Sequence, residues 1–228
     1  MSESNEIVKL LFIGNSATYV HDIPGTLESL AKNAGYRIEC ESIVEGGAKL
    51  SFHADDSSEH GKALLRMLNN KYDIVFLQDN GNCISSEDLR LESQKACDVL
   101  GRAIRSAGAR VGIYFRPPYG YEKWGYTPFE QCRETDRHFL KASISNDALN
   151  VYVNRAFAYA MKNTDYCLWG SDNAHTSEYG AYLAVCIFFA TIFSTSSKVL
   201  DSNGLPEKDA KTLQKIADKI ALREEIPW

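Results

Sequence analysis

The chain has 228 residues, of which 44% are hydrophobic and 24% are charged, and its formal net charge is -5 at pH 7. This composition fits a globular domain that can bury a core without disulfides or metals, and it excludes a chain that is disordered throughout. The weakly acidic balance, with no run rich in Lys and Arg, argues against a protein that binds nucleic acid or an anionic membrane surface.

The N-terminal sequence and the cysteine pattern favour a cytoplasmic protein with reduced thiols. Residues 1–6 lack the basic start and apolar stretch of a secretory signal, so we expect a cytoplasmic protein. The longest apolar stretch, residues 181–193, is too short to span a bilayer. The six cysteines include no Cys-x-x-Cys pair, and we expect reduced, mostly buried thiols. We expect no metal or organic cofactor.

Strand-like and helix-like segments alternate along the chain. Continuous apolar runs predict buried strands, and amphipathic stretches with capping residues predict helices. In chain order the expected elements are a strand over 7–13, a helix over 24–35, a strand over 36–44, a helix over 59–70, a strand over 72–78, a helix over 86–107, a strand over 110–115, a helix over 128–145, a short strand over 148–153, and helices over 176–193 and 207–222.

This alternation predicts an α/β fold, a three-layer α/β/α sandwich around a central parallel sheet of about five strands. No repeat or linker is evident, so residues 1–228 are predicted to form a single domain, with residues 201–228 as a helical tail packed on the same core. Ligand sites in such sheets lie outside the carboxyl ends of the strands. The loops that follow the strands are therefore the places where chemistry is expected.

The loop after the first predicted strand carries Ser16, within Gly14-Asn15-Ser16-Ala17-Thr18. A nucleophilic serine needs an exposed hydroxyl on a tight turn and a neighbouring base. A serine here is also suited to a purely structural strand-to-helix turn. Thr18 stands where the Gly-x-Ser-x-Gly elbow of α/β-hydrolases has glycine, which argues against that fold.

The loop before the predicted helix 176–193 carries Asp172 and His175. A catalytic histidine needs an acceptor that fixes its tautomer, and an aspartate three residues earlier in the same loop can supply it. The alternative is that Asp172 or Thr176 only caps the following helix.

The order of these motifs resembles the SGNH (GDSL-like) hydrolase superfamily over about residues 7–193. That family has, in order, a serine after the first strand, a glycine, an asparagine and Asp-x-x-His. The corresponding residues here are Ser16, Gly46-Gly47 after the second strand, Asn80 after the third, and Asp172 with His175. The details are most similar to a bacterial subgroup described as DUF4886-like, through residues 11–16, 46–50 with His53, and 172–183.

Three positions depart from the family pattern. Asn15 replaces the aspartate of Gly-Asp-Ser, Gln78 replaces the glycine two positions before the asparagine, and Gly81 replaces the aspartate that follows it. Gln78 therefore becomes a second candidate for the amide donor that the family places at Asn80.

The resemblance implies a flavodoxin-like SGNH hydrolase fold and a serine esterase acting on short acyl esters, with deacetylation of a carbohydrate as the expected reaction. It assigns Ser16 as nucleophile, His175 as base and Asp172 as the residue that orients His175. No cofactor is implied.

The resemblance also implies an oxyanion hole at the same strand ends. Its donors would be the backbone N–H of Ser16, that of Gly47 or Gly46, and the side chain of Asn80 or Gln78. Preorganised donors of this kind stabilise the charge that develops on an ester oxygen.

Residues 116–127 form a loop rich in proline, glycine and aromatic side chains after the fourth predicted strand. Arg116, Tyr119, Tyr121, Trp124 and Tyr126 combine flat faces with donors, which suits a sugar ring, although such loops also simply cover cores. We therefore expect a small-molecule or carbohydrate ester as the binding partner. The oligomeric state is left open.

Other functions remain compatible with parts of the pattern. A non-catalytic carbohydrate-binding protein would keep the aromatic loop, and a lipase or thioesterase would share the superfamily fold. A flavodoxin-like nucleotide-binding protein is disfavoured, because Gly-x-Gly-x-x-Gly is missing. His53 and His60 flank Asp55-Asp56 and suggest either a metal site or a solvated loop; the solvated loop is favoured because no third ligand is indicated.

Overall fold

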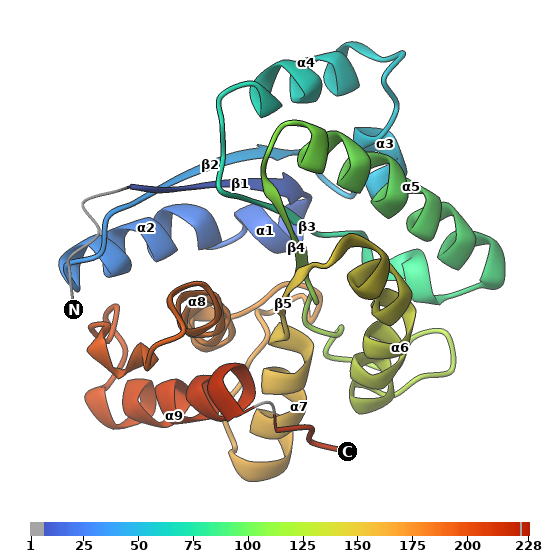
Figure 1. The fold of residues 1–228 in the computed structure, drawn as a ribbon. Coiled ribbons are helices and arrows are strands. Elements are labelled where there is room, and N and C mark those ends of the chain that lie inside the picture. The colour runs from blue at the N-terminus through green and yellow to red at the C-terminus, as the bar shows by residue number, and fades with distance from the viewer. Residues whose placement is uncertain (1–6, 224) are drawn as a thin grey trace.

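The computed structural model describes residues 7–223 and 225–228, and in this part of the chain five parallel strands form one sheet with helices on both faces (Figure 1). The strands are β1 (Val8–Gly14), β2 (Ile38–Val44), β3 (Ile74–Leu77), β4 (Arg110–Tyr114) and β5 (Leu149–Val151), in the order β2-β1-β3-β4-β5. Every neighbouring pair runs parallel. The predicted α/β/α sandwich with a five-stranded parallel sheet is confirmed.

Helices follow each strand in turn. The helices α1 (Ser16–Tyr19) and α2 (Ile23–Asn33) follow β1, and α3 (Leu50–His53) and α4 (Glu59–Leu68) follow β2. The 3-10 helix η1 (Gly81–Ile84) and α5 (Glu87–Ser106) follow β3, and α6 (Pro128–Asn146) follows β4. After β5 come α7 (Val153–Asn163), α8 (Glu178–Phe193), the 3-10 helix η2 (Ser197–Val199) and α9 (Glu207–Arg223).

The side chains of each strand alternate between two separate halves of the core. Leu10 and Phe12 of β1 pack with α2, α7, α8 and α9, whereas Leu11 and Ile13 pack with α4, α5 and α6. Successive strand residues point to opposite faces, which is why both faces of a covered sheet are apolar. Helix α8 is buried between the sheet and α9, and Leu213 of α9 belongs to the same core cluster (Figure 1).

The strand order brings the candidate motifs to one point of the sheet. The chain passes from β1 outward to β2 and then returns across β1 to β3, so the connections diverge between β1 and β3. Ligands bind at such switch points, outside the carboxyl ends of the strands. Ile13 pairs with Leu77 near these ends, so the segments that carry Ser16 and Asn80 emerge side by side.

The elements differ from the sequence prediction in several places. Helix α7 was not predicted, because Tyr152 precedes it without a side-chain cap and β5 runs directly into it. The one-turn helices α1 and α3 were also missed, since a single turn has no amphipathic period. Helix α8 begins at Glu178 rather than Thr176, and the Ser177 hydroxyl accepts the N–H of Gly180 at 3.3 Å. Ser177 is therefore the cap, and the alternative that Asp172 or Thr176 caps this helix is wrong.

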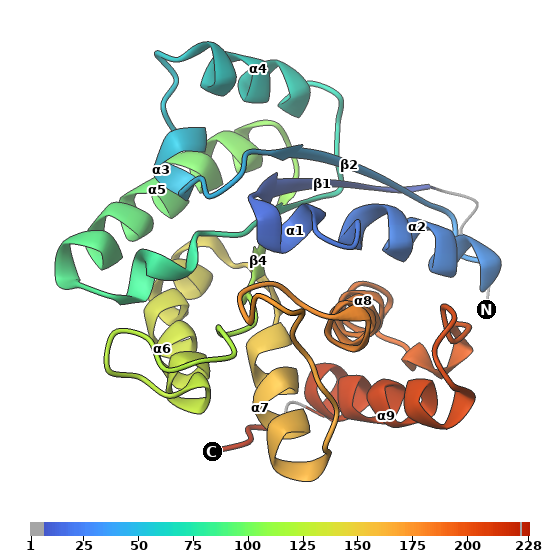
Figure 2. The ribbon, with the colours of Figure 1, turned by 180° about the vertical axis from the view of Figure 1, so that it is seen from behind.

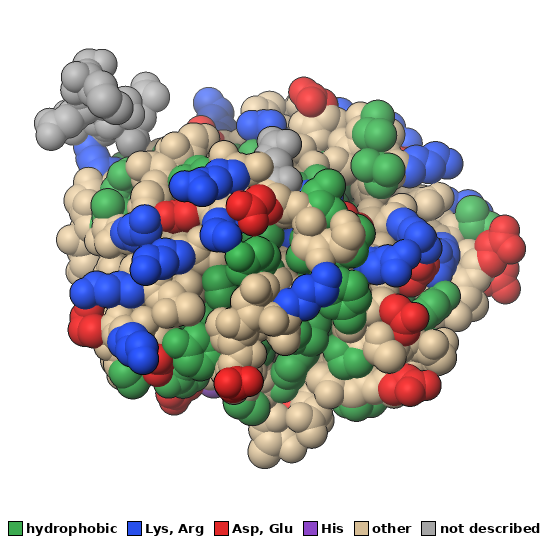
Figure 3. Space-filling model, turned by 90° about the horizontal axis from the view of Figure 1, so that it is seen from below, with side chains coloured by type: hydrophobic (Ala, Val, Ile, Leu, Met, Phe, Trp, Pro, Cys, Tyr) green, Lys and Arg blue, Asp and Glu red, His purple; other side chains and the backbone are tan. Residues whose placement is uncertain are grey.

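The surface carries both signs of charge. On the face seen from below in Figure 3, positive and negative side chains are interspersed around hydrophobic ones. No helix in the described part of the chain is long and apolar enough to cross a membrane. All six cysteines are free thiols; Cys40 is partly buried, Cys167 is exposed, and the other four are buried.

Candidate active site

Ser16 is the first residue of α1, on a turn that is hydrogen-bonded to the segments following β2 and β3. Asn15 caps this turn: its Oδ1 accepts the N–H of Ala17 at 3.1 Å, and its Nδ2 donates to the carbonyl of Ala48 at 2.8 Å. The backbone N–H of Asn15 and the hydroxyl of Thr18 both donate to Gln78 Oε1, each at 2.9 Å. The position of the Ser16 hydroxyl is thus fixed by hydrogen bonds to both neighbouring strand-end segments.

Asp172 and His175 lie in a compact loop closed by an antiparallel bridge between Trp169 and Thr176. Asp172 Oδ1 accepts the backbone N–H groups of Ala174 at 2.9 Å and His175 at 3.0 Å. These backbone hydrogen bonds, together with the one from the His175 side chain, hold the pKa of Asp172 well below its usual range. Asp172 is therefore a carboxylate throughout the neutral and mildly acidic range.

The three residues form a continuous hydrogen-bonded chain. His175 Nδ1 lies 2.6 Å from Asp172 Oδ2, and His175 Nε2 lies 2.9 Å from Ser16 Oγ. A carboxylate only accepts hydrogen bonds, so Nδ1 carries the proton, and the lone pair of Nε2 in the neutral imidazole faces the serine hydroxyl. Figure 2 shows the segment between α7 and α8, which carries Asp172 and His175, passing beneath α1.

Gly46 and Gly47 form a turn beside Ser16. The N–H of Ala48 donates to the carbonyl of Glu45 at 3.1 Å, and Gly47 has a φ of 70°. A residue with a side chain is strained at this φ, which accounts for the glycine. Within residues 7–223 and 225–228, the backbone N–H groups of Ser16, Gly46 and Gly47 have no hydrogen-bond acceptor.

Asn80 completes this edge of the site. Its Nδ2 donates to the carbonyl of Gly47 at 2.8 Å, and its Oδ1 accepts the N–H of Asn82 at 2.9 Å. A primary amide has two hydrogens on nitrogen. One hydrogen of Asn80 Nδ2 is thus left for a further acceptor.

Solved structures with this arrangement of strands and helices are known. No protein-family model and no curated protein matches the sequence. A DUF4886 family protein from Bacteroides uniformis is 16% identical over 97% of both chains, with a TM-score of 0.79. A protein from Slackia heliotrinireducens assigned to the SGNH hydrolases is 23% identical over 82% of this chain and 100% of its own, with a TM-score of 0.68. The acetylxylan esterase Axe2 from Geobacillus stearothermophilus is 17% identical over 81% and 94%, with a TM-score of 0.60.

The chain has the SGNH hydrolase fold. The resemblance expected from the four sequence motifs is confirmed at the level of the fold, and the similarity to a DUF4886 family protein extends over nearly the whole chain.

Gln78 occupies the position where the SGNH pattern has glycine, and its side chain is buried. It is 2% exposed, its Nε2 donates to the carbonyl of Asp79, and its Oε1 faces Asn15 and Thr18. A Cβ added to Gly14 would lie only 2.6 Å from Gln78 Oε1. Gln78 thus lies under the turn that carries Ser16, where Gly14 leaves room for it.

His21 connects the turn after α1 to the loop that carries His175, and no sequence motif marks this residue. Its Nε2 donates to the carbonyl of Thr176 at 2.9 Å, across 155 positions in sequence. His21 and Asp22 both have positive φ, 61° and 44°, which is uncommon for residues other than glycine. This turn connects the end of α1 to the residue that follows His175.

His53 corrects one sequence interpretation. The prediction of a solvated loop around His53 and His60 is wrong for His53, which is 1% exposed. Its Nε2 donates to the carbonyl of Gly14 at 2.9 Å, so its Nδ1 accepts from His60 Nε2 at 2.8 Å. Burial, and to a smaller degree His60, lowers the pKa of His53 to about 4. In the described residues, no three His, Cys, Asp or Glu side chains are grouped as metal ligands.

The aromatic loop 116–127 lies between η1 and the loop that carries His175. The N–H of Gly120 donates to the carbonyl of Asn173 at 2.7 Å, and Trp169 Nε1 donates to the carbonyl of Pro118 at 2.9 Å. Tyr119 packs on Gly81, which directly follows Asn80. The loop that carries the sequence-predicted substrate residues therefore contacts both the loop that carries His175 and the residue after Asn80.

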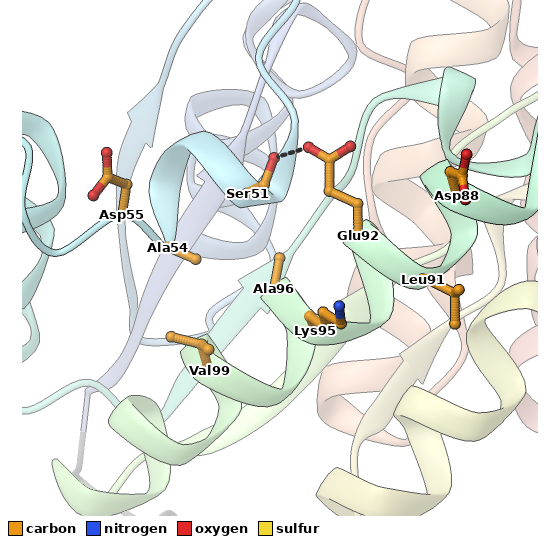
Figure 4. Close-up of a pocket in the computed structure, with 9 residues that line it drawn as sticks. All are labelled: Ser51, Ala54, Asp55, Asp88, Leu91, Glu92, Lys95, Ala96 and Val99. Atoms are coloured by element: carbon orange, nitrogen blue, oxygen red, sulfur yellow. Dashed lines mark hydrogen bonds between the residues drawn. The ribbon is translucent and has the colours of Figure 1, made fainter.

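A separate hollow of about 410 Å³ lies between α3 and α5 (Figure 4). Ala96, Leu91 and Val99 of α5 line it, and the Ser51 hydroxyl donates to Glu92 at its edge. None of Ser16, Asp172 and His175 contributes to its lining. This hollow is thus separate from the candidate catalytic centre.

Proposed function

We propose that the chain is a serine esterase that removes short acyl groups, with Ser16 as nucleophile, His175 as general base and acid, and Asp172 as the residue that orients His175. The observation that carries this proposal is the hydrogen-bonded chain from Asp172 Oδ2 through both nitrogens of His175 to Ser16 Oγ, at 2.6 and 2.9 Å. Nucleophile, base and orienting acceptor stand within hydrogen-bond reach of each other, as acyl transfer through serine requires.

In the first half of the reaction, Ser16 Oγ attacks the ester carbonyl carbon while His175 Nε2 takes the serine proton. The imidazolium that forms is stabilised by the Asp172 carboxylate. When the tetrahedral intermediate collapses, the bond to the alcohol oxygen breaks and that oxygen takes the proton from Nε2. The acyl group is then bonded to Ser16.

In the second half, His175 Nε2 takes a proton from a water molecule, whose oxygen attacks the acyl carbon. Collapse of the second intermediate breaks the bond to Ser16 Oγ, which recovers its proton from Nε2. The carboxylic acid leaves and the free serine is restored.

The oxyanion would be bound by the Ser16 N–H, by the N–H of Gly47 or Gly46, and by the free hydrogen on Asn80 Nδ2. We favour Asn80 over Gln78, because Gln78 is buried and its amide already serves Asn15, Thr18 and Asp79. Donors held by the protein before the reaction stabilise a developing charge without reorganising.

For the substrate we propose a short acyl ester of a carbohydrate. Acetylxylan esterases are among the solved structures similar to this chain. His175 and Asp172 have 35% and 50% of their side-chain surface exposed, which suits a bulky alcohol approaching an open site. Tyr121, which is exposed on the same loop, offers an aromatic face of the kind on which sugar rings stack.

The test compares Ser16→Ala with wild type on p-nitrophenyl acetate and on acetylated xylo-oligosaccharides. The expected loss of rate is on the order of 10⁴ to 10⁶ for the folded variant. Ser29→Ala, an exposed serine on α2, serves as the matched control and should keep the wild-type rate. A folded Ser16→Ala protein with more than about a tenth of the wild-type rate would exclude this mechanism.

A further inference from the structure

Arg116 directly follows Phe115 at the end of β4, and its side chain is largely buried, with a fully buried Nε that has no hydrogen-bond partner. The residue is 7% exposed, and its Nε is a buried donor with no hydrogen bond. In residues 7–223 and 225–228, no carboxylate or other acceptor pairs with this guanidinium. The contact it makes is with the ring of Tyr119, whose centroid lies 4.4 Å from Arg116 Cζ.

A buried arginine of this kind is costly for a folded protein. Guanidinium does not give up its proton, so it cannot avoid its charge by becoming neutral. Stacking on one aromatic ring stabilises the guanidinium by less free energy than its removal from water costs. Buried charges are ordinarily paired, and an unpaired one therefore points to an anion that is bound during function.

The guanidinium lies beside Gly81, the residue that follows Asn80 of the proposed oxyanion hole. A Cβ added to Gly81 would lie 2.0 Å from Arg116 Nη1. Consecutive Cα atoms are about 3.8 Å apart and a Cα–Cβ bond is about 1.5 Å long, so Nη1 is within about 7.5 Å of the Cα of Asn80. This contact also explains why glycine stands at position 81, where the SGNH pattern has aspartate: Arg116 and Tyr119 fill the space that a side chain would need.

A second cation is held on the same aromatic cluster. Lys123 Nζ lies 3.8 Å from the ring centroid of Tyr119, 4.7 Å from that of Trp124 and 5.8 Å from that of Tyr121. In the described part of the chain, this ammonium group has no carboxylate partner. Tyr119 thus contacts two positive charges that have no carboxylate partner among the described residues, those of Arg116 and Lys123.

The loop keeps these groups in place. Lys123 and Tyr126 exchange two backbone hydrogen bonds at 3.0 Å around Trp124 and Gly125, which both have positive φ. The amide of Gln131, which is 1% exposed, accepts the N–H of Tyr119 and donates to two carbonyls of the loop. A rigid loop presents its cations without the entropic cost of ordering them on binding.

We propose that Arg116 and Lys123 form a subsite for an anionic group, a carboxylate or a phosphate, on the ester substrate. This inference rests on the proposed esterase function and narrows its substrate to acyl esters that carry a negative charge near the scissile bond. Guanidinium binds both anions through paired N–H donors, and the ammonium group adds a point charge.

The experiment compares three phenyl esters of similar size: neutral phenyl acetate, 4-acetoxybenzoate and 4-acetoxyphenyl phosphate. Each kcat/KM is divided by the rate of spontaneous hydrolysis, so that leaving-group reactivity cancels. Wild type is expected to prefer at least one anionic ester by about 10-fold or more at low salt, and the preference should shrink as ionic strength rises. The anionic ester that is preferred more strongly shows whether the subsite binds a carboxylate or a phosphate.

Variants identify the residues responsible. Arg116→Gln and Lys123→Gln should each reduce the anionic-to-neutral ratio toward one, whereas Lys141→Gln, an exposed lysine on α6, should leave it unchanged. Both esters are measured with the same protein sample, so partial unfolding lowers both rates equally and does not change the anionic-to-neutral ratio. If Arg116→Gln fails to fold, Lys123→Gln decides the question.

A binding measurement separates this inference from the proposed function. Calorimetric titration of Ser16→Ala with 4-hydroxybenzoate and with 4-hydroxyphenyl phosphate, each against phenol, reports the subsite without turnover. Tighter binding of an anionic compound, lost in the double variant Ser16→Ala/Lys123→Gln, supports the subsite even if no ester is hydrolysed. The subsite would be overturned if the corrected kcat/KM values of the neutral and anionic esters were equal, or if the anionic compounds bound no more tightly than phenol. Either result would leave the proposed esterase function standing.

Discussion

The side-chain oxygen of Gln78 accepts the backbone N–H of Asn15 at 2.9 Å, which ties the end of β3 to the turn that carries Ser16. The same oxygen accepts the Thr18 hydroxyl on the far side of Ser16. Two residues flanking the nucleophile are therefore fixed by one buried amide. These contacts support our proposal that Gln78 positions the turn, whereas Asn80 supplies the side-chain donor of the oxyanion hole.

Substitutions at these two positions should affect different quantities. Gln78→Ala leaves the buried N–H of Asn15 without an acceptor, which costs roughly 1 to 3 kcal/mol of the free energy of unfolding. Asn80→Ala should lower kcat by about 10² to 10³ with a smaller effect on stability. Thermal unfolding and ester kinetics on both variants, with Asn33→Ala on α2 as control, measure the two effects. A larger loss of kcat in a stable Gln78→Ala protein would make Gln78 the donor instead.

His21 should control the alignment of Ser16 with His175. Its bond to the carbonyl of Thr176 fixes the turn after α1 to the histidine loop. Small misplacements of a catalytic group cost up to about 10² in rate, and we expect His21→Ala to lower kcat by about 10-fold. His21 is exposed, so the unfolding temperature should change little. His21→Gln keeps a donor and should recover part of the rate; wild-type kcat in His21→Ala would show that the bond has no such role.

The protein should lose stability between about pH 6.5 and pH 4. The pKa of His53 is lowered to about 4 by burial, so the unfolded chain binds more protons than the folded one across this range. The free energy of unfolding therefore falls as pH falls, by up to about 3 kcal/mol for this histidine. His138, whose pKa burial also lowers to about 4, acts in the same direction.

Urea unfolding of wild type and His53→Gln at pH 7 and pH 4.5 measures the share that belongs to His53. The glutamine amide can still donate to the carbonyl of Gly14, but it does not titrate. We expect the variant to lose less stability than wild type on acidification. An identical loss in both proteins would mean that the buried His53–His60 pair does not determine the acid sensitivity.

The acyl group should be short. The hollow between α3 and α5 is not lined by any of the three proposed catalytic residues, so it offers no continuous channel from Ser16 for a long chain. A series of p-nitrophenyl esters should show kcat/KM falling steeply beyond about four acyl carbons, and acetate should be released from at least one acetylated sugar. A preference for about eight carbons or more, without deacetylation of any sugar, would favour a lipase or thioesterase.

The three central strands, β1, β3 and β4, could be predicted from the sequence because each contains a short apolar run that is followed by glycine or a polar residue. Ile13, Leu77 and Ile113 all belong to runs of this kind and are fully or almost fully buried. Helix α7 was missed because no capping side chain marks its start. The close pairing of Ser16 with His175 depends on contacts 159 positions apart, which local patterns do not encode and only the order of motifs suggested.

The roles of Gln78 and His53 could not be read from the chain. Gln78 was predicted as a second candidate for the amide donor and His53 as part of a solvated loop, whereas both side chains are buried by neighbours from other elements. Burial of a polar residue depends on partners such as the Gly14 carbonyl, which become adjacent only when the sheet forms. The roles proposed for His21 and Arg116 likewise depend on tertiary contacts, with Thr176 and Tyr119 respectively.

The most direct test of the central proposal is to label the protein with a fluorophosphonate and map the adduct by peptide mass spectrometry. A serine activated by His175 should be phosphonylated at Oγ of Ser16, with rapid, stoichiometric incorporation. Labelling should vanish in Ser16→Ala, fall steeply in His175→Ala, and persist in the control Ser29→Ala. An adduct on another serine, or no adduct on native protein, would contradict the assignment of Ser16 as the nucleophile.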